Sequence, residues 1–379
     1  MTQSERIKDI ARLFLKLGFT AFGGPAAHIA MMQQEVVRDR KWMDEQRFLD
    51  LVGAVNLIPG PNSTELAIHI GHERGGWRGL IVAGLCFIVP AVLITGIFAW
   101  LYKEYGQLPE LQPFIYGIKP AVIAVIIAAI FPLAKKSAKN TLLVIIGMLV
   151  LALSLLDINE FFLMFGAGIV ALLFTAVRTG RHKGMNAIYP FGLFHISGIA
   201  SDPELNMRLF LMFLKMGAIL YGSGYVLFAF LDTELVAIGF LTRQQLIDAI
   251  AVGQFTPGPV FSSVTFVGWQ INGITGAAVS TLAIFLPSFA FVALLSPLVK
   301  EMRGSDLMGA FMDAVNIASV AIIIAVCCSM AVDTVSDWKT VLITLLSLYI
   351  VFRYRINSAF IVIGGSIAGY IFYLLPTVF

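Results

Sequence analysis

Two Pro-Gly-Pro tripeptides, Pro59-Gly60-Pro61 and Pro257-Gly258-Pro259, interrupt long apolar stretches of the chain. A proline removes a backbone donor and blocks the preceding helical turn, while a glycine opens conformations that other residues avoid. In the hydrocarbon of a membrane, such a break is tolerated only where it is packed in protein or lines a cavity. Two breaks at matching places of two similar halves are typical of a transporter site built from discontinuous helices. The alternative is that each tripeptide merely kinks a packed helix.

The composition indicates a membrane protein. Hydrophobic residues make up 58% of the 379 residues, charged residues only 13%, and the mean hydropathy is +0.87. A soluble domain has about a quarter of its residues charged, so most of this chain lies in lipid or in packed protein. Neither the three cysteines nor the five histidines show metal-ligand spacing. We therefore expect an all-α polytopic membrane protein that is not an enzyme, with no cofactor, no metal and, at a net charge of +3, no nucleic-acid partner.

Apolar stretches of about 20 residues predict the membrane spans. Four ordinary stretches in the first half reach or approach this length, and they cover residues 80–102, 114–133, 142–156 and 161–177. Two further stretches, 10–32 and 48–71, hold helix breakers near their middle. Each of these two either folds back as a re-entrant helical hairpin or is an ordinary span, with the charged segment 33–47 outside the membrane.

The second half of the chain repeats the first. Residues 14–18 (Phe-Leu-Lys-Leu-Gly) correspond to residues 213–217 (Phe-Leu-Lys-Met-Gly), the two Pro-Gly-Pro tripeptides coincide, and Pro90 corresponds to Pro287. The register hardly drifts over this distance, which indicates a tandem duplication. We predict an N-terminal membrane repeat over residues 1–177, a linker over 178–204 and a C-terminal membrane repeat over 205–379.

The loop charges predict that the two repeats lie upside down relative to each other. Lys and Arg mark the cytoplasmic loops of a membrane protein. In the first half they gather in alternate loops, as Arg38, Arg40, Lys41, Arg47, Arg74, Arg78, Lys135, Lys136 and Lys139. The corresponding loops of the second half carry Asp232, Glu234, Asp333 and Asp337. Inverted repeats with discontinuous or re-entrant helices at their interface fit this pattern, and they require that part of the linker, at 185–200, crosses the membrane.

The motifs Phe22-Gly23-Gly24-Pro25 and Pro59-Gly60-Pro61-Asn62-Ser63, together with the duplication, resemble the chromate ion transporters in their long, two-domain form. The resemblance covers nearly the whole chain. It implies a multi-pass protein of the cell (inner) membrane that exports chromate from the cytoplasm and so confers chromate resistance. The implied driving force is the proton gradient or the membrane potential, with sulfate as the isosteric competitor. A sulfate or oxyanion importer and a passive anion channel are the alternatives.

A tetrahedral dianion that leaves water needs fixed hydrogen-bond donors and a positive potential. The start of a half-helix supplies both, because its free amides carry about half a positive charge. We expect one such start from each repeat to meet near the membrane midplane. The substrate-binding candidates beside the breaks of the first repeat are Gly23, Gly24, Asn56, Pro59, Gly60, Pro61, Asn62 and Ser63. Those of the second repeat are Gly222, Ser223, Gln254, Pro257, Gly258, Pro259 and Ser262.

Three lysines lie within apolar stretches. Lys16 and Lys215 occupy the same place in both repeats, and they are the candidates for the positive charge that binds the anion. The alternative is that both snorkel to the membrane interface. Lys119 corresponds to Asn316 in the other repeat, and it either lines the anion path or anchors a helix end.

Glu65 is the candidate for carrying a coupling proton, because it follows Pro61 on a predicted half-helix and has no counterpart carboxylate. His28 and His69 also lie in apolar stretches and are further candidates.

The matched acidic pairs Glu35/Glu234 and Asp50/Asp248 flank the apolar stretches, so we expect them to be solvated or salt-bridged helix caps.

The expected partners are a small oxyanion, chromate or sulfate, and the lipid bilayer. Small-residue faces such as Gly364-Gly365 and Gly369 would also support a homodimer.

Overall fold

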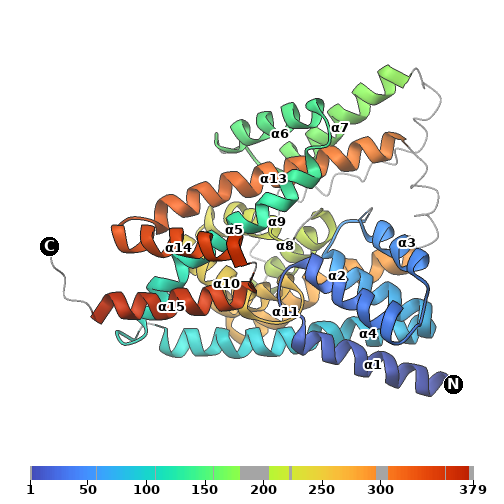
Figure 1. The fold of residues 1–379 in the computed structure, drawn as a ribbon, viewed down its shortest axis with the longest axis horizontal. Helices are drawn as coiled ribbons and strands as arrows, with labels where there is room; N and C mark the ends of the chain where they lie inside the picture. Colours follow the sequence, from blue (N-terminus) through green and yellow to red (C-terminus); the bar gives the residue numbers. More distant parts are fainter. Residues whose placement is uncertain are drawn as a thin grey trace.

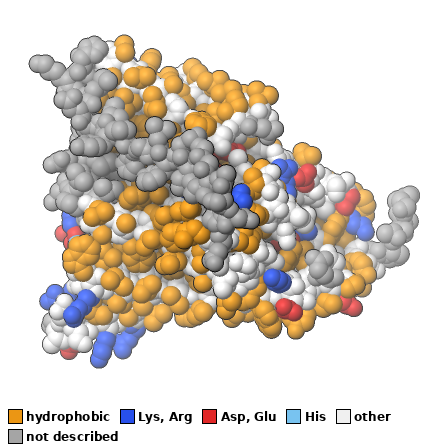
Figure 2. Space-filling model, turned by 180° about the vertical axis from the view of Figure 1, so that it is seen from behind, with side chains coloured by type: hydrophobic (Ala, Val, Ile, Leu, Met, Phe, Trp, Pro, Cys, Tyr) orange, Lys and Arg blue, Asp and Glu red, His pale blue; other side chains and the backbone are white. Residues whose placement is uncertain are grey.

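The computed structural model describes residues 2–56, 58–106, 108–156, 158–179, 205–221, 224–295, 306–354 and 356–374. Within these ranges the chain consists of helices and turns, with no strand (Figure 1). Among them, five helices are long and apolar enough to cross a membrane. Figure 2 shows that the visible face is largely apolar, and exposed side chains such as Leu93, Phe131 and Ile145 contribute to such a lipid-facing surface. The prediction of an all-α polytopic membrane protein is confirmed.

Both repeats contain the same order of α- and π-helices in the described ranges, and the second has a short 3₁₀-helix in addition. The first consists of α1 (Gln3–Thr20), α2 (Pro25–Gln33), the π-helix η1 (Gln34–Asp39), α3 (Glu45–Val55), α4 (Asn62–Tyr105), α5 (Gln112–Ser137), α6 (Thr141–Ser154) and α7 (Glu160–Thr179). The second consists of α8 (Leu205–Ile219), α9 (Val226–Leu231), the π-helix η3 (Asp232–Val236), α10 (Arg243–Phe255), the short 3₁₀-helix η4 (Val260–Ser262), α11 (Ser263–Leu295), α13 (Asp306–Thr334), α14 (Trp338–Tyr354) and α15 (Ser358–Leu374). Even the π-helical turn recurs. The domain limits 1–177, 178–204 and 205–379 stay a prediction.

The long helices α4 and α11 each fold back on themselves at a glycine. Gly76 has φ 61° and Gly273 has φ 59°, a left-handed conformation that L side chains rarely adopt. After the reversal the backbone of Gly79 packs against that of Gly71. Each Pro-Gly-Pro is therefore followed by a half-helix of about four turns, which is packed against the spanning helix that continues it.

Counterpart helices run antiparallel, as inverted repeats require. Tyr116, near the start of α5, donates a hydrogen bond to Asp337, which follows the end of α13. Lys139, just beyond the end of α5, forms an ion pair of 2.6 Å with Asp313 near the start of α13. Because α5 and α13 correspond to each other, the two repeats are upside down relative to one another. The segment 185–200, which this topology requires to cross the membrane, lies outside the described residues.

The first helices of both repeats return along themselves after their break. Lys16 of α1 pairs with Glu35 of η1, and Lys215 of α8 pairs with Glu234 of η3 at 2.6 Å. The π-helix that follows the short helix therefore lies beside the lysine of the first helix. This is the geometry of a helical hairpin, and of the two arrangements left open by the sequence it is the one that the structure shows.

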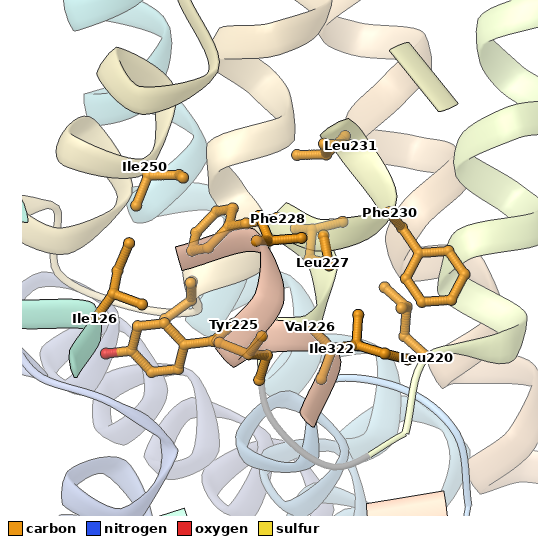
Figure 3. Packing of buried hydrophobic residues seen from close by; sticks show 14 of the residues in the cluster. Ile126, Leu220, Tyr225, Val226, Leu227, Phe228, Phe230, Leu231, Ile250 and Ile322 are labelled. Atoms are coloured by element: carbon orange, nitrogen blue, oxygen red, sulfur yellow. The ribbon is translucent and has the colours of Figure 1, made fainter. Parts of the chain in front are cut away.

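The two short helices differ in their surroundings, although they correspond in sequence. Every side chain of α9 is buried, and Figure 3 shows them packed against Ile126 of α5, Ile250 of α10 and Ile322 of α13. In contrast, α2 buries only His28 and Met32. The repeats thus share a backbone plan but not the same packing state.

Glycines bring the spanning helices α5 and α15 into backbone contact. Gly117 faces Gly365 and Gly369 so closely that a Cβ on Gly117 would collide with both. Without a hydrophobic driving force in lipid, such small-residue contacts hold helices together. Gly365 and Gly369 are therefore covered within the chain, which corrects the expectation that they form a dimer face. The homodimer itself stays a prediction.

We expect Gly117→Ala to lower the stability of the protein by about 1–3 kcal/mol, because the added methyl group overpacks the contact between α5 and α15. Thermal unfolding in detergent, followed by size-exclusion chromatography, measures the loss. Gly364→Ala is the matched control, since a Cβ there meets nothing within 4 Å. Equal stability of the two variants would contradict this packing.

Candidate functional site

Each Pro-Gly-Pro separates two helices completely rather than kinking one. In the first repeat α3 ends at Val55 and α4 begins at Asn62, and Gly60 between them has φ 132°. In the second, α10 ends at Phe255 and Gly258 has φ 92° before the next helical turn begins. These values favour glycine, which explains why it lies between the two prolines. The alternative of a kink in a continuous helix does not describe either position.

The two breaks meet and exchange backbone hydrogen bonds. The N–H of Gly60 donates to the carbonyl of Leu220 at 2.7 Å, and the N–H of Gly258 donates to the carbonyl of Ala21 at 2.8 Å. Ala21 and Leu220 occupy corresponding places, directly after the first helix of each repeat. The exchange is therefore symmetric, and it joins the Pro-Gly-Pro of each repeat to the Gly-rich break of the other.

The half-helix that starts α4 keeps free donors at its end. Pro61 stands at the N-cap position and gives no side-chain cap, while its carbonyl accepts from the amides of Thr64 and Glu65. Asn62 donates instead to Asn56 at 2.8 Å, across the break. The amides of Asn62 and Ser63 thus point out of the helix end with its positive partial charge. An anion binds favourably at such a terminus.

A buried carboxylate lies directly on the first break. Glu65 is fully buried, and a Cβ on Gly60 would collide with its Oε1 and lie 3.1 Å from Oγ of Ser288 on α11. Neither Glu65 nor Ser288 completes a hydrogen bond of good geometry with another described side chain. In the second repeat the counterpart of Glu65 is Ser263, whose hydroxyl is likewise buried and unpaired in the described part of the chain. A buried polar group without a partner is costly, so a proton, a cation or a ligand donor would relieve this site.

Further polar side chains surround the second break. Tyr225 donates to Oε1 of Gln254 at 3.2 Å, while Nε2 of Gln254 has no partner among the described residues. Thr95 of α4 contacts Ser262 at 3.4 Å. A Cβ on Gly24 would lie 3.9 Å from the Tyr225 hydroxyl, so the Gly-Gly break of the first repeat faces this group too. The site thus contains several donors and one unpaired carboxylate, drawn from both repeats.

The break residues are closed off from solvent on one side. All described residues from Thr256 to Gly268 are buried, whereas Asn56 beside the first break is exposed and Asn62 is half-buried. Of the candidates at the two Pro-Gly-Pro breaks in the described ranges, Asn56 and Asn62 are therefore the ones nearest the surface. Gly222 and Ser223 lie outside the described residues.

Of the three candidates for proton coupling, two lie at the breaks. Nε2 of His28 lies 3.1 Å from the carbonyl of Ala21, the same oxygen that accepts from Gly258. Glu65 lies on Gly60, as described. His69 is buried further along α4. Within the ranges described, no cluster of three metal-ligating side chains is present.

The structure does not bring Lys16 and Lys215 into the breaks. The side chain of Lys16 is 59% exposed and that of Lys215 35%, and each is paired with the glutamate of its own hairpin. The expectation that Glu35 and Glu234 are salt-bridged is confirmed. The hydrogen bond from the Lys16 ammonium lowers the pKa of Glu35 below its ordinary value.

Sequence reasoning missed the polar residues that are contributed by other helices. Thr95 and Ser288 lie far along the chain from either Pro-Gly-Pro, and Tyr225, which directly follows Gly224, reads from the sequence as an ordinary apolar-stretch residue. The sequence predicts a solvated or salt-bridged helix cap at Asp248. Its side chain is 5% exposed, lies within α10 and accepts a hydrogen bond from Tyr102, so it is neither solvated nor a cap. Its ion pair with Lys119 agrees with the salt-bridged alternative.

The sequence profile of the family described as "Chromate transporter" matches this chain twice, over residues 8–172 and 207–370. The chain belongs to the chromate transporter family. The chromate transport protein of Cupriavidus metallidurans is 30% identical over 97% of this chain and 94% of its own length. The probable chromate transport protein of Synechococcus elongatus is 29% identical over 97% of the chain and 96% of its own length. The chromate transport protein of Pseudomonas aeruginosa is 26% identical over 94% and 90%. No solved structure matches the chain.

We expect Gly60→Ala to abolish chromate binding at this candidate site while leaving much of the fold intact. The methyl group would collide with the Glu65 carboxylate and force an unfavourable φ, which costs about 1–3 kcal/mol. Chromate binding to the purified variant and its melting temperature are the two measurements.

Gly239→Ala is the control for the strain alone, because Gly239 has φ 79° but a Cβ there meets nothing within 4 Å. If both variants bound chromate equally well, the close approach of Gly60 and Glu65 would have no part in the site.

Proposed function

We propose that this protein exports chromate across the cell (inner) membrane, and thereby confers chromate resistance. The observation that carries the proposal is the meeting of the two Pro-Gly-Pro breaks of inverted repeats, joined by the reciprocal bonds of Gly60 and Gly258. This arrangement places a half-helix start and several hydroxyl and amide donors around one buried point. The relatives named as chromate transport proteins cover nearly the whole chain and support the choice of anion.

The charge of the substrate supports the direction. An inside-negative potential of 100 mV favours the exit of a dianion by about 4.6 kcal/mol, at about 2.3 kcal/mol per elementary charge. Export thus requires no other energy source, and a proton gradient would add to it where a carboxylate takes part. Sulfate has the same charge and shape, so it is the expected competitor for donors that read only charge and geometry. Transport of sulfate or another oxyanion into the cell is the alternative.

The unequal packing of the two repeats supports an alternating mechanism. The short helix α9 of the second repeat packs against α10 and α13 and is enclosed, while α2 packs against α3 and α4 and is half-exposed. Because the repeats are inverted copies, a second conformation would have the packing of the two repeats interchanged. The change between the two conformations would open the site to the other side of the membrane. A passive channel needs no such asymmetry.

Flux measurements in proteoliposomes test the function. We expect vesicles to accumulate chromate when their interior is made positive, and a counter-gradient of sulfate on the other side to accelerate this uptake by exchange. Absence of chromate flux with the vesicle interior either positive or negative would contradict the proposal. A flux that shows neither saturation nor exchange would indicate a channel.

Glu65→Gln tests the coupling role of this carboxylate. We expect the variant to keep the chromate flux that the membrane potential drives. The stimulation of this flux by a proton gradient should fall about tenfold, because glutamine cannot release a proton. Glu73→Gln on the same half-helix is the matched control, since Glu73 pairs with Arg47 at the surface. Unchanged stimulation in Glu65→Gln would shift the coupling role to His28 or His69.

The lysine pair has its own test. If Lys16 and Lys215 supply positive potential to the anion path, Lys16→Ala and Lys215→Ala each raise the KM for chromate several-fold, whereas the arginine variants keep it. A normal KM in both alanine variants would restrict the two lysines to their hairpin ion pairs.

A further inference from the structure

A second polar cluster lies between the repeats, away from the breaks. It consists of Asp248 on α10 of the second repeat, with Tyr102 on α4 and Lys119 on α5 of the first. The hydroxyl of Tyr102 donates to Oδ2 of Asp248 at 2.6 Å, and Nζ of Lys119 lies 3.9 Å from Oδ1. The side chains of Asp248 and Lys119 are 5% and 18% exposed. Tyr102 and Lys119 are the titratable groups that act on Asp248 within the described residues.

The Lys119–Asp248 ion pair is long. At 3.9 Å the ammonium is beyond hydrogen-bond distance, and Oδ1 has no hydrogen-bond partner in the described ranges. A buried ion pair contributes little net stability, because the loss of hydration offsets the attraction. Charged side chains inside a spanning segment usually mark an ion pathway. Stability alone therefore does not account for this pair.

The cluster does not recur at the corresponding described residues of the other repeat, although the chain is duplicated. Lys119 corresponds to Asn316, and Asp248 corresponds to Asp50, which is half-buried at the other hairpin. The hairpin pairs Lys16–Glu35 and Lys215–Glu234, in contrast, occur in both repeats. The role of Lys119 is therefore limited to one side of the breaks.

The cluster lies about 10 Å from the second break, along two antiparallel helices. On α4, Thr95 contacts Ser262 and Tyr102 follows two turns later, at 1.5 Å per residue. On α10, Asp248 precedes Phe255 by about two turns. The rings of Phe98 and Phe255 meet edge to face at 4.8 Å between these two contacts. This aromatic pair therefore lies between the second break and the cluster.

We propose that Lys119 is the transient binding site of the oxyanion on this side of the breaks, and that Asp248 competes with the oxyanion for the Lys119 ammonium. This inference rests on the proposed function. When the anion takes Lys119, the carboxylate of Asp248 loses its counter-charge and takes up a proton from water. When the anion leaves, Asp248 releases that proton and recovers Lys119. Tyr102 holds Asp248 in place through both steps.

The competition predicts how anion affinity depends on pH. Asp248→Asn imitates the protonated state, so at high pH we expect it to bind chromate about tenfold more tightly than the wild type, and at low pH equally tightly. The comparison of the two proteins at each pH cancels the titration of chromate itself. Lys119→Gln loses about tenfold in affinity at every pH, and Lys119→Arg keeps most of it. The double variant behaves as Lys119→Gln alone, because the two groups act on one another.

Binding of radioactive chromate to the purified full chain in detergent gives these affinities, with sulfate as the competitor. Asp313→Asn is the matched control, since Asp313 forms an ion pair of 2.6 Å with Lys139, which is exposed, and should leave the pH profile unchanged. Tyr102→Phe provides a second variant should Asp248→Asn fail to fold. With the hydrogen bond removed, the carboxylate takes up a proton more readily, so the rise in chromate affinity on lowering the pH begins at a higher pH than in the wild type.

Each result decides between the proposals. A wild type that binds chromate while Asp248→Asn shows an unchanged or weaker affinity at high pH overturns this inference and leaves the proposed function intact. Equal losses of thermal stability in Asp248→Asn and Lys119→Gln with normal binding would make the pair purely structural, and would also overturn it. A wild type that binds neither chromate nor sulfate would overturn both proposals.

Discussion

The hydrogen bonds from Gly60 and Gly258 to the opposite repeat are the contacts on which the rest of the structure depends. A broken helix in a membrane leaves amides and carbonyls that lipid cannot satisfy. Here each repeat supplies the acceptor for the other, because Ala21 and Leu220 present carbonyls that their own helices no longer use. Neither repeat completes its own break. The site therefore arises from the duplication, and neither half by itself would contain it.

Backbone symmetry and side-chain asymmetry serve different purposes at this interface. The breaks, the π-helical turns and the reversals at Gly76 and Gly273 recur in both repeats, so the frame for binding is two-fold. The side chains on that frame differ, because Glu65 corresponds to Ser263 and Lys119 corresponds to Asn316. A two-fold frame alone would bind and release an anion equally on both sides. Single ionisable groups make the two sides of this frame chemically different.

Much of the frame could be predicted from the sequence, because its determinants are local. The prolines and glycines that break the helices, and the register between the halves, are visible as residues. The pairing of Lys16 with Glu35 was also within reach, since the same 19-residue spacing recurs in Lys215 and Glu234. The burial of Asp248 was not, because its counterpart Asp50 stays near the surface and only the packing of α10 against α4 and α5 encloses it. Ser288 and Thr95 were missed for the same reason.

In lipid, hydrophobicity does not distinguish the inside of a protein from the outside, so shape and polarity must do so. Shape is provided by glycine contacts, as where Gly117 lets α5 lie directly on Gly365 of α15. Polarity is concentrated at the breaks, where Glu65, Ser263 and Gln254 keep unpaired buried atoms in the described structure. Such atoms raise the free energy of the empty site. An oxyanion accepts several hydrogen bonds at once, so under the proposed function its binding would pair the donors among them and favour the occupied conformation over the empty one.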